Sequence, residues 1–426
     1  MFLTDAKQKN RLFSSKGFQI NNQLSLNEIS QINYLTQQGR TKAARQLANH
    51  CWFKKPWDID LVIAISEMYS KNGENKRAIT LLIEARKMIS NWRLQRCYTG
   101  LMSKYGYISS YLRDQLEICI RIAPNDIYLP YVDLISYVWR VDGCGQYLVD
   151  LCLKLERFKK LRPSDYIMIA AIYNEAGNFA RAINTYKKAK QLDEHISQNL
   201  QYLNLGITLS KRGVFPAEEA NLYLSANSKL SDDHDSFEKL VLENKNCIAV
   251  VGNSPVLINS DAGEEIDSHN LVIRFNAYST DFIYACDYGK KTNIWVKTGH
   301  YLDIPHRNLN NFDCVVLSGC NFPNRSTLGL DLVSDHITSS SAINFIPNNV
   351  YEDLFKELEA VPSAGLCILY WIYTLIGPLP RECFFGFSHE TSMFNFEQHY
   401  FSNTKKEGSS SHNWSKEAEV IHKYLR

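Results

Sequence analysis

The sequence lacks a long apolar run, a net charge of any size and any paired-cysteine motif, and each absence excludes a class of protein. No apolar stretch reaches the roughly 18 residues of a membrane-spanning helix. The N-terminal MFLTDAKQKNRLFSSKG also lacks the apolar core of a secretory signal. The 47 Lys and Arg nearly balance the 45 Asp and Glu, which disfavours nucleic acid or an anionic membrane as a partner. The eleven cysteines form no Cys-x-x-Cys pair, which argues against zinc and redox motifs.

A repeat marks the first half of the chain. Gly39 and Gly73 are 34 residues apart, which is the tetratricopeptide period. Small, leucine and tyrosine residues recur at matching offsets around Gly73 (Ser66, Tyr69, Ala78, Leu82, Ala85) and Gly177 (Ala170, Tyr173, Ala182, Tyr186, Ala189), with partial copies at Gly39 (Ala44, Ala48) and Gly206 (Gly213, Ala220). Small residues let paired helices approach closely. Residues 24–230 are therefore predicted to form an α-solenoid of five or six hairpins, preceded by a poorly ordered segment, 1–23.

After this region, strand signals alternate with helical ones. A polar joint, SDDHD, opens a predicted linker helix within residues 231–245. Six short runs rich in apolar and β-branched residues follow: Ile248–Val251, Leu271–Phe275, Thr292–Val296, Cys314–Leu317, Ile343–Ile346 and Cys383–Phe387. The alternation predicts a doubly wound parallel sheet over residues 246–426, so the fold class is α plus α/β.

Polar residues follow the first two predicted strands. Gly252 ends the first strand and lets the backbone turn closely, which places Asn253 and Ser254 at its carboxyl end. Asn276 follows the second strand. Ligands of open α/β sheets bind at this edge, so these residues form a candidate nucleotide site.

Four segments in order resemble the motifs of one enzyme family. The large motif of the sialyltransferases is matched by CIAVVGNSPVLINSDAGEEIDSHNLVIRFN, residues 247–276. The small, third and very small motifs are matched by PSAG with Ser363 and Gly365, by His399-Tyr400, and by HNWSKE with His412 and Glu417. Together they span about 170 residues. The C-terminal region thus resembles glycosyltransferase family 29, which implies a Rossmann-like sheet, the sialyltransferase variant of the GT-A fold.

The resemblance implies an inverting transfer of an acidic keto-sugar from its CMP ester to a glycan hydroxyl, without a metal or other cofactor. His412 would be the general base and His399 would donate to the departing phosphate, since imidazole titrates near neutral pH. The implied donor-binding residues are Asn253, Ser254, Asn276, Ser363 and Gly365, and the supporting residues are Gly252, Arg274, Tyr400 and Glu417. Arg274 would pair with a neighbouring carboxylate or contact a substrate carboxylate, and Glu417 would orient the His412 ring or steady its motif.

Cysteine usage bears on the compartment. The disulfide of the family would join Cys247 to the position held by Ile376, with Cys367 or Cys383 as substitutes. The absence of this partner, of a signal and of an anchor implies a reducing cytoplasm, in a bacterium, with peripheral association at the inner membrane left open.

Several functions remain open at this point. Sialic acid is the first choice of sugar, and Kdo, pseudaminic and legionaminic acid are alternatives, in capsule or lipopolysaccharide synthesis. A different class of function is a tetratricopeptide scaffold with an inactive nucleotide-binding domain. Its repeats would then bind a protein partner or a growing glycan.

Overall fold

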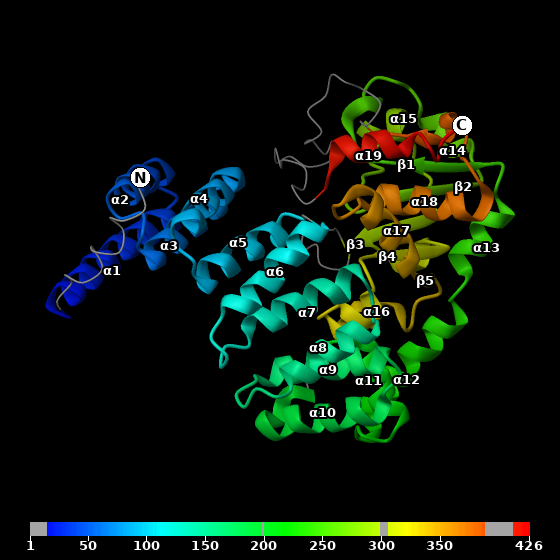
Figure 1. The fold of residues 1–426 in the computed structure, drawn as a ribbon. Helices are drawn as coiled ribbons and strands as arrows, with labels where there is room; N and C mark the ends of the chain where they lie inside the picture. Colours follow the sequence, from blue (N-terminus) through cyan, green and yellow to red (C-terminus); the bar gives the residue numbers. More distant parts are fainter. Residues whose placement is uncertain (1–14, 107, 198–199, 299–305, 388–411) are drawn as a thin grey trace. The chain divides into compact units, whose positions relative to one another are not determined.

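The computed structural model describes residues 15–106, 108–197, 200–298, 306–387 and 412–426. The chain divides into two compact units, one of residues 1–105 and 110–134 and one of residues 106–109 and 135–426. In its described residues, the regular elements of the first unit are all helices. The second combines further helices with a parallel sheet (Figure 1).

Paired helices form the predicted hairpins. They are α1 (Ser15–Gln37), α2 (Thr41–Lys54), α3 (Ile59–Lys71), α4 (Asn75–Met88), α5 (Trp92–Lys104), α6 (Ser110–Ile122), α7 (Leu129–Val141), α8 (Gln146–Leu155), α9 (Pro163–Glu175), α10 (Phe179–Leu192), α11 (Leu203–Lys211) and α12 (Ala217–Asp232). Within the described ranges, each pair turns at a glycine of positive φ, a conformation that costs glycine little: Gly39, Gly73, Gly106, Gly143, Gly177 and Gly213. The helical hairpin prediction is confirmed.

The small residues of the repeat lie where the helices touch. Ala78, Ala85, Ala182 and Ala189 are all fully buried. Gly206 lies inside α11, where an added Cβ would come within 2.2 Å of the Tyr223 ring. The repeat pattern therefore records helix-to-helix packing.

Six parallel strands form one sheet in the second unit. They are β1 (Ile248–Val251), β2 (Leu271–Phe275), β3 (Ile294–Thr298), β4 (Cys314–Ser318), β5 (Ala342–Phe345) and β6 (Phe384–Phe385), in the order β5-β4-β3-β2-β1-β6. All six predicted strands are confirmed: β1 and β2 have the predicted ends, and the ends of the other four differ by at most two residues. The shift of β3 matters most, because it adds Lys297 and Thr298 to the strand.

Helices cover both faces of the sheet. One core cluster joins alternate strand residues to α13 (Ser236–Glu243), α17 (Asn348–Leu358), α18 (Ala364–Ile376) and α19 (Trp414–Ile421). On the other face, Ala249, Val251 and Val272 pack against α14 (Gly263–Ser268) and α15 (Phe282–Tyr288). Trp295 and Val315 pack there against Tyr278 and Phe312, and the short α16 (Phe322–Arg325) follows β4. Figure 1 shows α17 and α18 beside the strands. With both faces covered, the sheet is doubly wound, as predicted.

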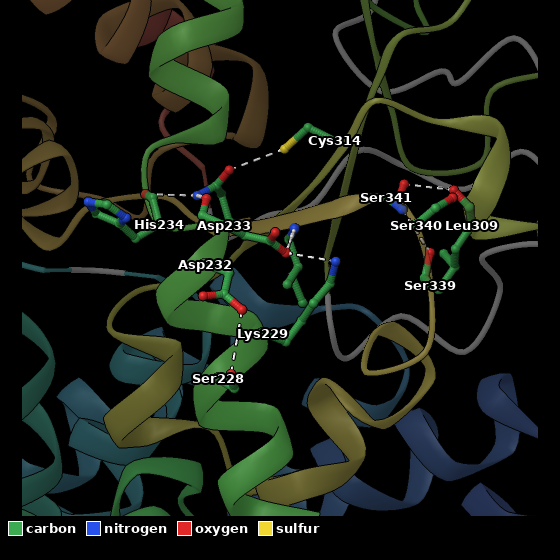
Figure 2. Close-up of polar contacts among 12 residues, drawn as sticks. Ser228, Lys229, Asp232, Asp233, His234, Leu309, Cys314, Ser339, Ser340 and Ser341 are labelled. Atoms are coloured by element: carbon green, nitrogen blue, oxygen red, sulfur yellow. Dashed lines mark hydrogen bonds and ion pairs between the residues drawn. The ribbon is translucent and has the colours of Figure 1, made fainter.

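The joint between α12 and α13 is hydrogen-bonded to edge strand β5. Asp233 accepts the N–H of Ile343 (2.9 Å) and forms an ion pair with Lys229 (3.1 Å). Asn344 donates to the carbonyls of Asp233 and His234, both at 2.9 Å. Figure 2 shows Lys229, Asp233 and His234 at this joint. The polar segment that the sequence placed before the sheet is thus attached to it.

All eleven cysteines are free thiols, including Cys247, Cys367 and Cys383. Cys247 Sγ accepts the N–H of Asn270 at 3.2 Å. In the part of the chain that the structure describes, no helix is both long and apolar enough to cross a membrane.

Candidate functional site

The ends of β1 and β6 meet through two glycines. The Gly252 N–H donates to the Phe385 carbonyl (2.8 Å), and the Ser254 N–H donates to the Gly386 carbonyl (2.9 Å). A Cβ on Gly252 would lie 2.4 Å from the Gly386 oxygen, and Gly386 has φ +68°. Neither position has room for a side chain, so the close approach of the two backbones explains Gly252.

Phe387 connects this turn to the start of α18. A Cβ added to Gly252 would lie 3.0 Å from its ring, and one added to Gly365 only 2.5 Å. The Phe387 ring stacks on Phe384, with centroids 3.9 Å apart. Glycines of the large and small motifs therefore face one aromatic ring. Sequence reasoning did not assign this ring a role, although Phe387 ends the sixth predicted strand.

Asn253 and Ser254 lie at the carboxyl end of β1, as predicted. Asn253 Nδ2 donates to the Phe275 carbonyl (2.9 Å), which fixes the amide. Asn253 Oδ1 and Ser254 Oγ are buried and have no hydrogen-bond partner within the described ranges. Buried polar atoms without partners are rare, because each costs free energy. Their clustering at a strand end indicates a place for a polar ligand.

Asn276 lies at the end of the neighbouring strand, in the left-handed region (φ 47°) that asparagine tolerates. Its Oδ1 accepts the N–H (3.1 Å) and the hydroxyl (3.3 Å) of Thr298. Its backbone oxygen accepts the Trp295 indole N–H at 2.9 Å. The amide oxygen thus links β2 to β3. Nδ2 has no partner among the described residues.

Arg274 lies in the middle of the sheet and only 1% of it is exposed. Its guanidinium donates to the carbonyls of Lys291 (2.9 Å) and Tyr288 (2.5 Å). The nearest carboxylate, that of Asp267, is 4.0 Å away. Burial lowers the pKa of Arg274 to about 10. Its main partners are two backbone carbonyls, with one carboxylate at longer range.

Ser363 and Glu417 form a buried pair at the start of α18. Ser363 Oγ accepts the N–H of Leu366 (3.2 Å), which caps the helix. The Ser363 N–H and hydroxyl donate to the two carboxylate oxygens of Glu417, at 2.8 and 2.7 Å. Glu417 is completely buried. The sequence suggested that Glu417 either orients the His412 ring or steadies its motif. The bonds to Ser363 correspond to the second role, because they join the very small motif to the small motif.

His412 contacts the same segment. Its Nδ1 lies 2.8 Å from the Val361 carbonyl oxygen, and its ring packs edge-on against Trp414. Because a carbonyl only accepts, Nδ1 carries the hydrogen, and the lone pair of the neutral ring is on Nε2. His399 and Tyr400 lie outside the described residues.

One feature that the sequence reasoning missed is a cavity of about 700 Å³ at the carboxyl ends of β3 and β4. Lys297 and Thr298 line it, together with residues that follow both strands. The sequence analysis ended the third strand at Val296, so it did not identify these two residues as part of a site. No cluster of three or more His, Cys, Asp or Glu suited to a metal occurs in the described ranges.

The fold is a doubly wound α/β domain, and polar groups without a partner among the described residues lie at the carboxyl edge of its sheet, where ligands of such folds bind. Residues 187–305 match the model of glycosyltransferase family 29 (sialyltransferase). The matched segment runs from within α10 through β3, and it includes the strand ends that carry Asn253, Asn276 and Thr298. The chain thus contains a segment similar to this family, as the motifs predicted.

Solved structures with similarity include two described as a mammalian sialyltransferase, one of them in complex with Gal-beta-1-3GalNAc-ortho-nitrophenol. The complex is 22% identical, covers 51% of this chain and 81% of its own, and has a TM-score of 0.35. The other is 21% identical with the same coverages and a TM-score of 0.36. A structure of MamA is 16% identical, covers 39% of this chain and 96% of its own, and has a TM-score of 0.32.

Proposed function

We propose that the protein transfers an acidic keto-sugar, with sialic acid as the first choice, from its CMP ester to a glycan hydroxyl. The observation that carries the proposal is the fixed orientation of His412, whose Nδ1 binds the Val361 carbonyl. In the neutral ring, Nε2 is then the basic nitrogen, as a general base requires.

The reaction is one displacement with inversion. The acceptor oxygen forms a bond to the anomeric carbon as the bond from that carbon to the phosphate oxygen breaks, and CMP departs with the electron pair. His412 Nε2 takes the acceptor proton. His399 is proposed to donate to the departing phosphate, which gains negative charge in this step.

The donor phosphate is proposed to bind between β1 and α18. Asn253, Ser254 and the amide nitrogen of Asn276 offer groups without partners in the described part of the chain. The backbone N–H groups of Ala364 and Gly365, in the first turn of α18, also have none among the described residues. The positive end of a helix dipole favours an anion there.

The finer assignments are also proposals. Kdo, pseudaminic or legionaminic acid are the alternative sugars, the transfer requires no metal, and the product belongs to a bacterial capsule or lipopolysaccharide. The protein acts in the cytoplasm, with peripheral contact at the inner membrane as a further option. Residues 24–230 are proposed to bind a protein partner, 231–245 to link, and 246–426 to catalyse.

A CMP-release assay with and without EDTA, across CMP-Neu5Ac, CMP-Kdo and CMP-pseudaminic acid, tests the function. One donor should be hydrolysed slowly at the same rate in both conditions, and His399→Ala should lose this activity. Transfer by His412→Ala should fall at least 100-fold, the lower range for a general base, with CMP affinity nearly unchanged. His422→Ala, an exposed histidine just after α19, is the matched control and should match the wild type.

Two results would contradict the proposal. A His412→Ala variant that still transfers at the wild-type rate would remove the proposed base. A wild-type protein that neither binds CMP at millimolar concentration nor turns over any donor would favour the scaffold hypothesis.

A further inference from the structure

The cavity at the ends of β3 and β4 lies next to the proposed donor site. Thr298 lines the cavity, and its N–H and hydroxyl both donate to Asn276 Oδ1. In the sheet order, β2 lies between β1 and β3. Asn253, Asn276 and Lys297 therefore lie at or near the ends of successive strands, which are about 4.8 Å apart. A ligand that extends from β1 across the sheet edge would enter this cavity.

Lys297 is a cation without a described counterion. Its side chain is partly buried at the end of β3 and lines the cavity. Within the described residues, no ion pair or hydrogen bond involves its ammonium group, which lies 5.2 Å from the centre of the Trp295 ring. Burial lowers the pKa of Lys297, and the negative charge of Asp335 acts in the opposite direction. A charge withdrawn from water without a partner is costly, and an anionic ligand would offset that cost.

Arg307 places a second cation in the same cavity. Its guanidinium stacks on the Tyr278 ring at 3.9 Å from the centre and donates to the Tyr278 carbonyl. Its Nε is buried and has no partner among the described residues. The exposed carboxylates of Asp331 and Asp335 also line the cavity, where they suit sugar hydroxyls as acceptors.

Hydrogen bonds hold the cavity wall in place. Asn310 Oδ1 accepts from the Ser339 hydroxyl (3.1 Å) and from the N–H (2.9 Å) and hydroxyl (3.0 Å) of Ser340. The Ser341 hydroxyl donates to the Leu309 carbonyl at 2.7 Å, as Figure 2 shows. These bonds join the segment before β4 to the segment before β5. The cavity therefore has a wall fixed before any ligand arrives, which lowers the cost of binding.

We propose that Lys297 binds the carboxylate of the acidic sugar of the CMP donor, with Arg307 as the second cation of this subsite. This inference rests on the proposed function. A CMP-linked keto-acid sugar carries two anions, the phosphodiester and the carboxylate. The phosphodiester would bind near β1, to uncharged polar groups and the N-terminus of α18. The carboxylate would bind to the cations near the end of β3. Lys297 thus selects acidic over neutral sugars.

The experiment measures binding to the full-length protein by isothermal titration calorimetry. The ligands are CMP, the 3-fluoro analogue of the donor that the CMP-release assay identifies, and the methyl ester of that analogue. The fluorine beside the anomeric carbon slows the departure of CMP, and the ester removes the negative charge. Lys297→Met should weaken binding of the acid analogue about 10- to 100-fold, the range for a hydrogen bond to a charged group.

Three comparisons should accompany that loss. Lys297→Met should bind CMP within about twofold of the wild type and should bind the ester as the wild type does. Lys297→Arg, which keeps the charge, should retain most of the affinity for the acid. The matched control is Lys290→Met, an exposed lysine before the opposite end of β3, which should change none of the three affinities.

An equal loss for CMP and for the acid analogue would overturn the proposal, because Lys297 would then bind the phosphate. An unchanged affinity for the acid in both Lys297 variants would overturn it as well. If the wild type bound neither CMP nor any donor, the proposed function would fail first and this proposal with it.

Discussion

The burial of His336 predicts how the stability of the protein depends on pH. The residue ends a short helical turn, Ser334–His336, and is 1% exposed. Both ring nitrogens are buried without a hydrogen-bond partner in the described part of the chain. Burial, and then the charges of Lys297 and Lys229, lower its pKa from 6.5 to about 3. The folded protein therefore keeps this ring neutral at pH values at which the unfolded chain protonates it.

The direction in which stability changes with pH follows from the number of protons that each state binds. Between about pH 6.5 and pH 3 the unfolded chain binds more protons than the folded protein, so acidification favours unfolding. The contribution is fully present above pH 6.5 and falls by about 1.4 kcal/mol per pH unit below it. From pH 7 to pH 5, His336 should lower the free energy of unfolding by about 2 kcal/mol. His336→Leu, of similar volume, should lack this component.

Urea unfolding at pH 7, 6 and 5 measures the effect. The wild type should lose about 2 kcal/mol more than His336→Leu between pH 7 and pH 5. His234, with 71% of its side chain exposed, provides the control, and His234→Gln should retain the wild-type pH dependence. Equal losses in the wild type and His336→Leu would show that the buried ring does not titrate as described.

Three further substitutions test the contacts around the site. Gly252→Ala should destabilise the protein by several kcal/mol in urea unfolding, because its Cβ would lie 2.4 Å from the Gly386 oxygen; wild-type stability would contradict the close approach. Glu417→Gln replaces an acceptor of two bonds from Ser363, and we expect a loss of about 2 kcal/mol with weakened CMP binding. If calorimetry showed wild-type CMP affinity in Glu417→Gln, the bonds between Ser363 and Glu417 would not contribute to donor binding. Arg274→Met leaves two buried carbonyls without a donor and should cost about 3 kcal/mol, whereas an unchanged urea midpoint would refute a structural role.

Local pattern predicted most of the fold. The glycines at 34-residue spacing, such as Gly39 and Gly73, mark hairpin turns, because a positive φ is a local demand that glycine meets. Short β-branched runs such as Ile248–Val251 became strands, because apolar residues on both sheet faces need helices on both sides. Strand ends were less certain. Lys297 and Thr298 extend β3, since hydrogen bonding to β4 continues beyond the apolar run.

The candidate site was predicted in part. Asn253, Ser254 and Asn276 could be placed at strand ends, since their positions follow directly from the strands. Their hydrogen bonds could not, because the Asn253 amide and the Asn276 oxygen meet atoms that are 22 residues away in the chain. That Asn253 Oδ1 has no hydrogen-bond partner among the described residues can be recognised only in the folded structure.

The sequence by itself determined the helical repeat, the order of strands and helices, and the motif residues, because each depends on residue type and short spacing. Only the tertiary structure decided which hydrogen-bond partners the motif residues have. Ser363 and Glu417 are 54 residues apart, and Val361 and His412 are 51 apart, yet each pair is hydrogen-bonded. The burial of a side chain and the electrostatic field that acts on it likewise depend on residues from the whole fold. The charge of Lys297 in its cavity and the neutral ring of His336 therefore appear only when the chain has folded.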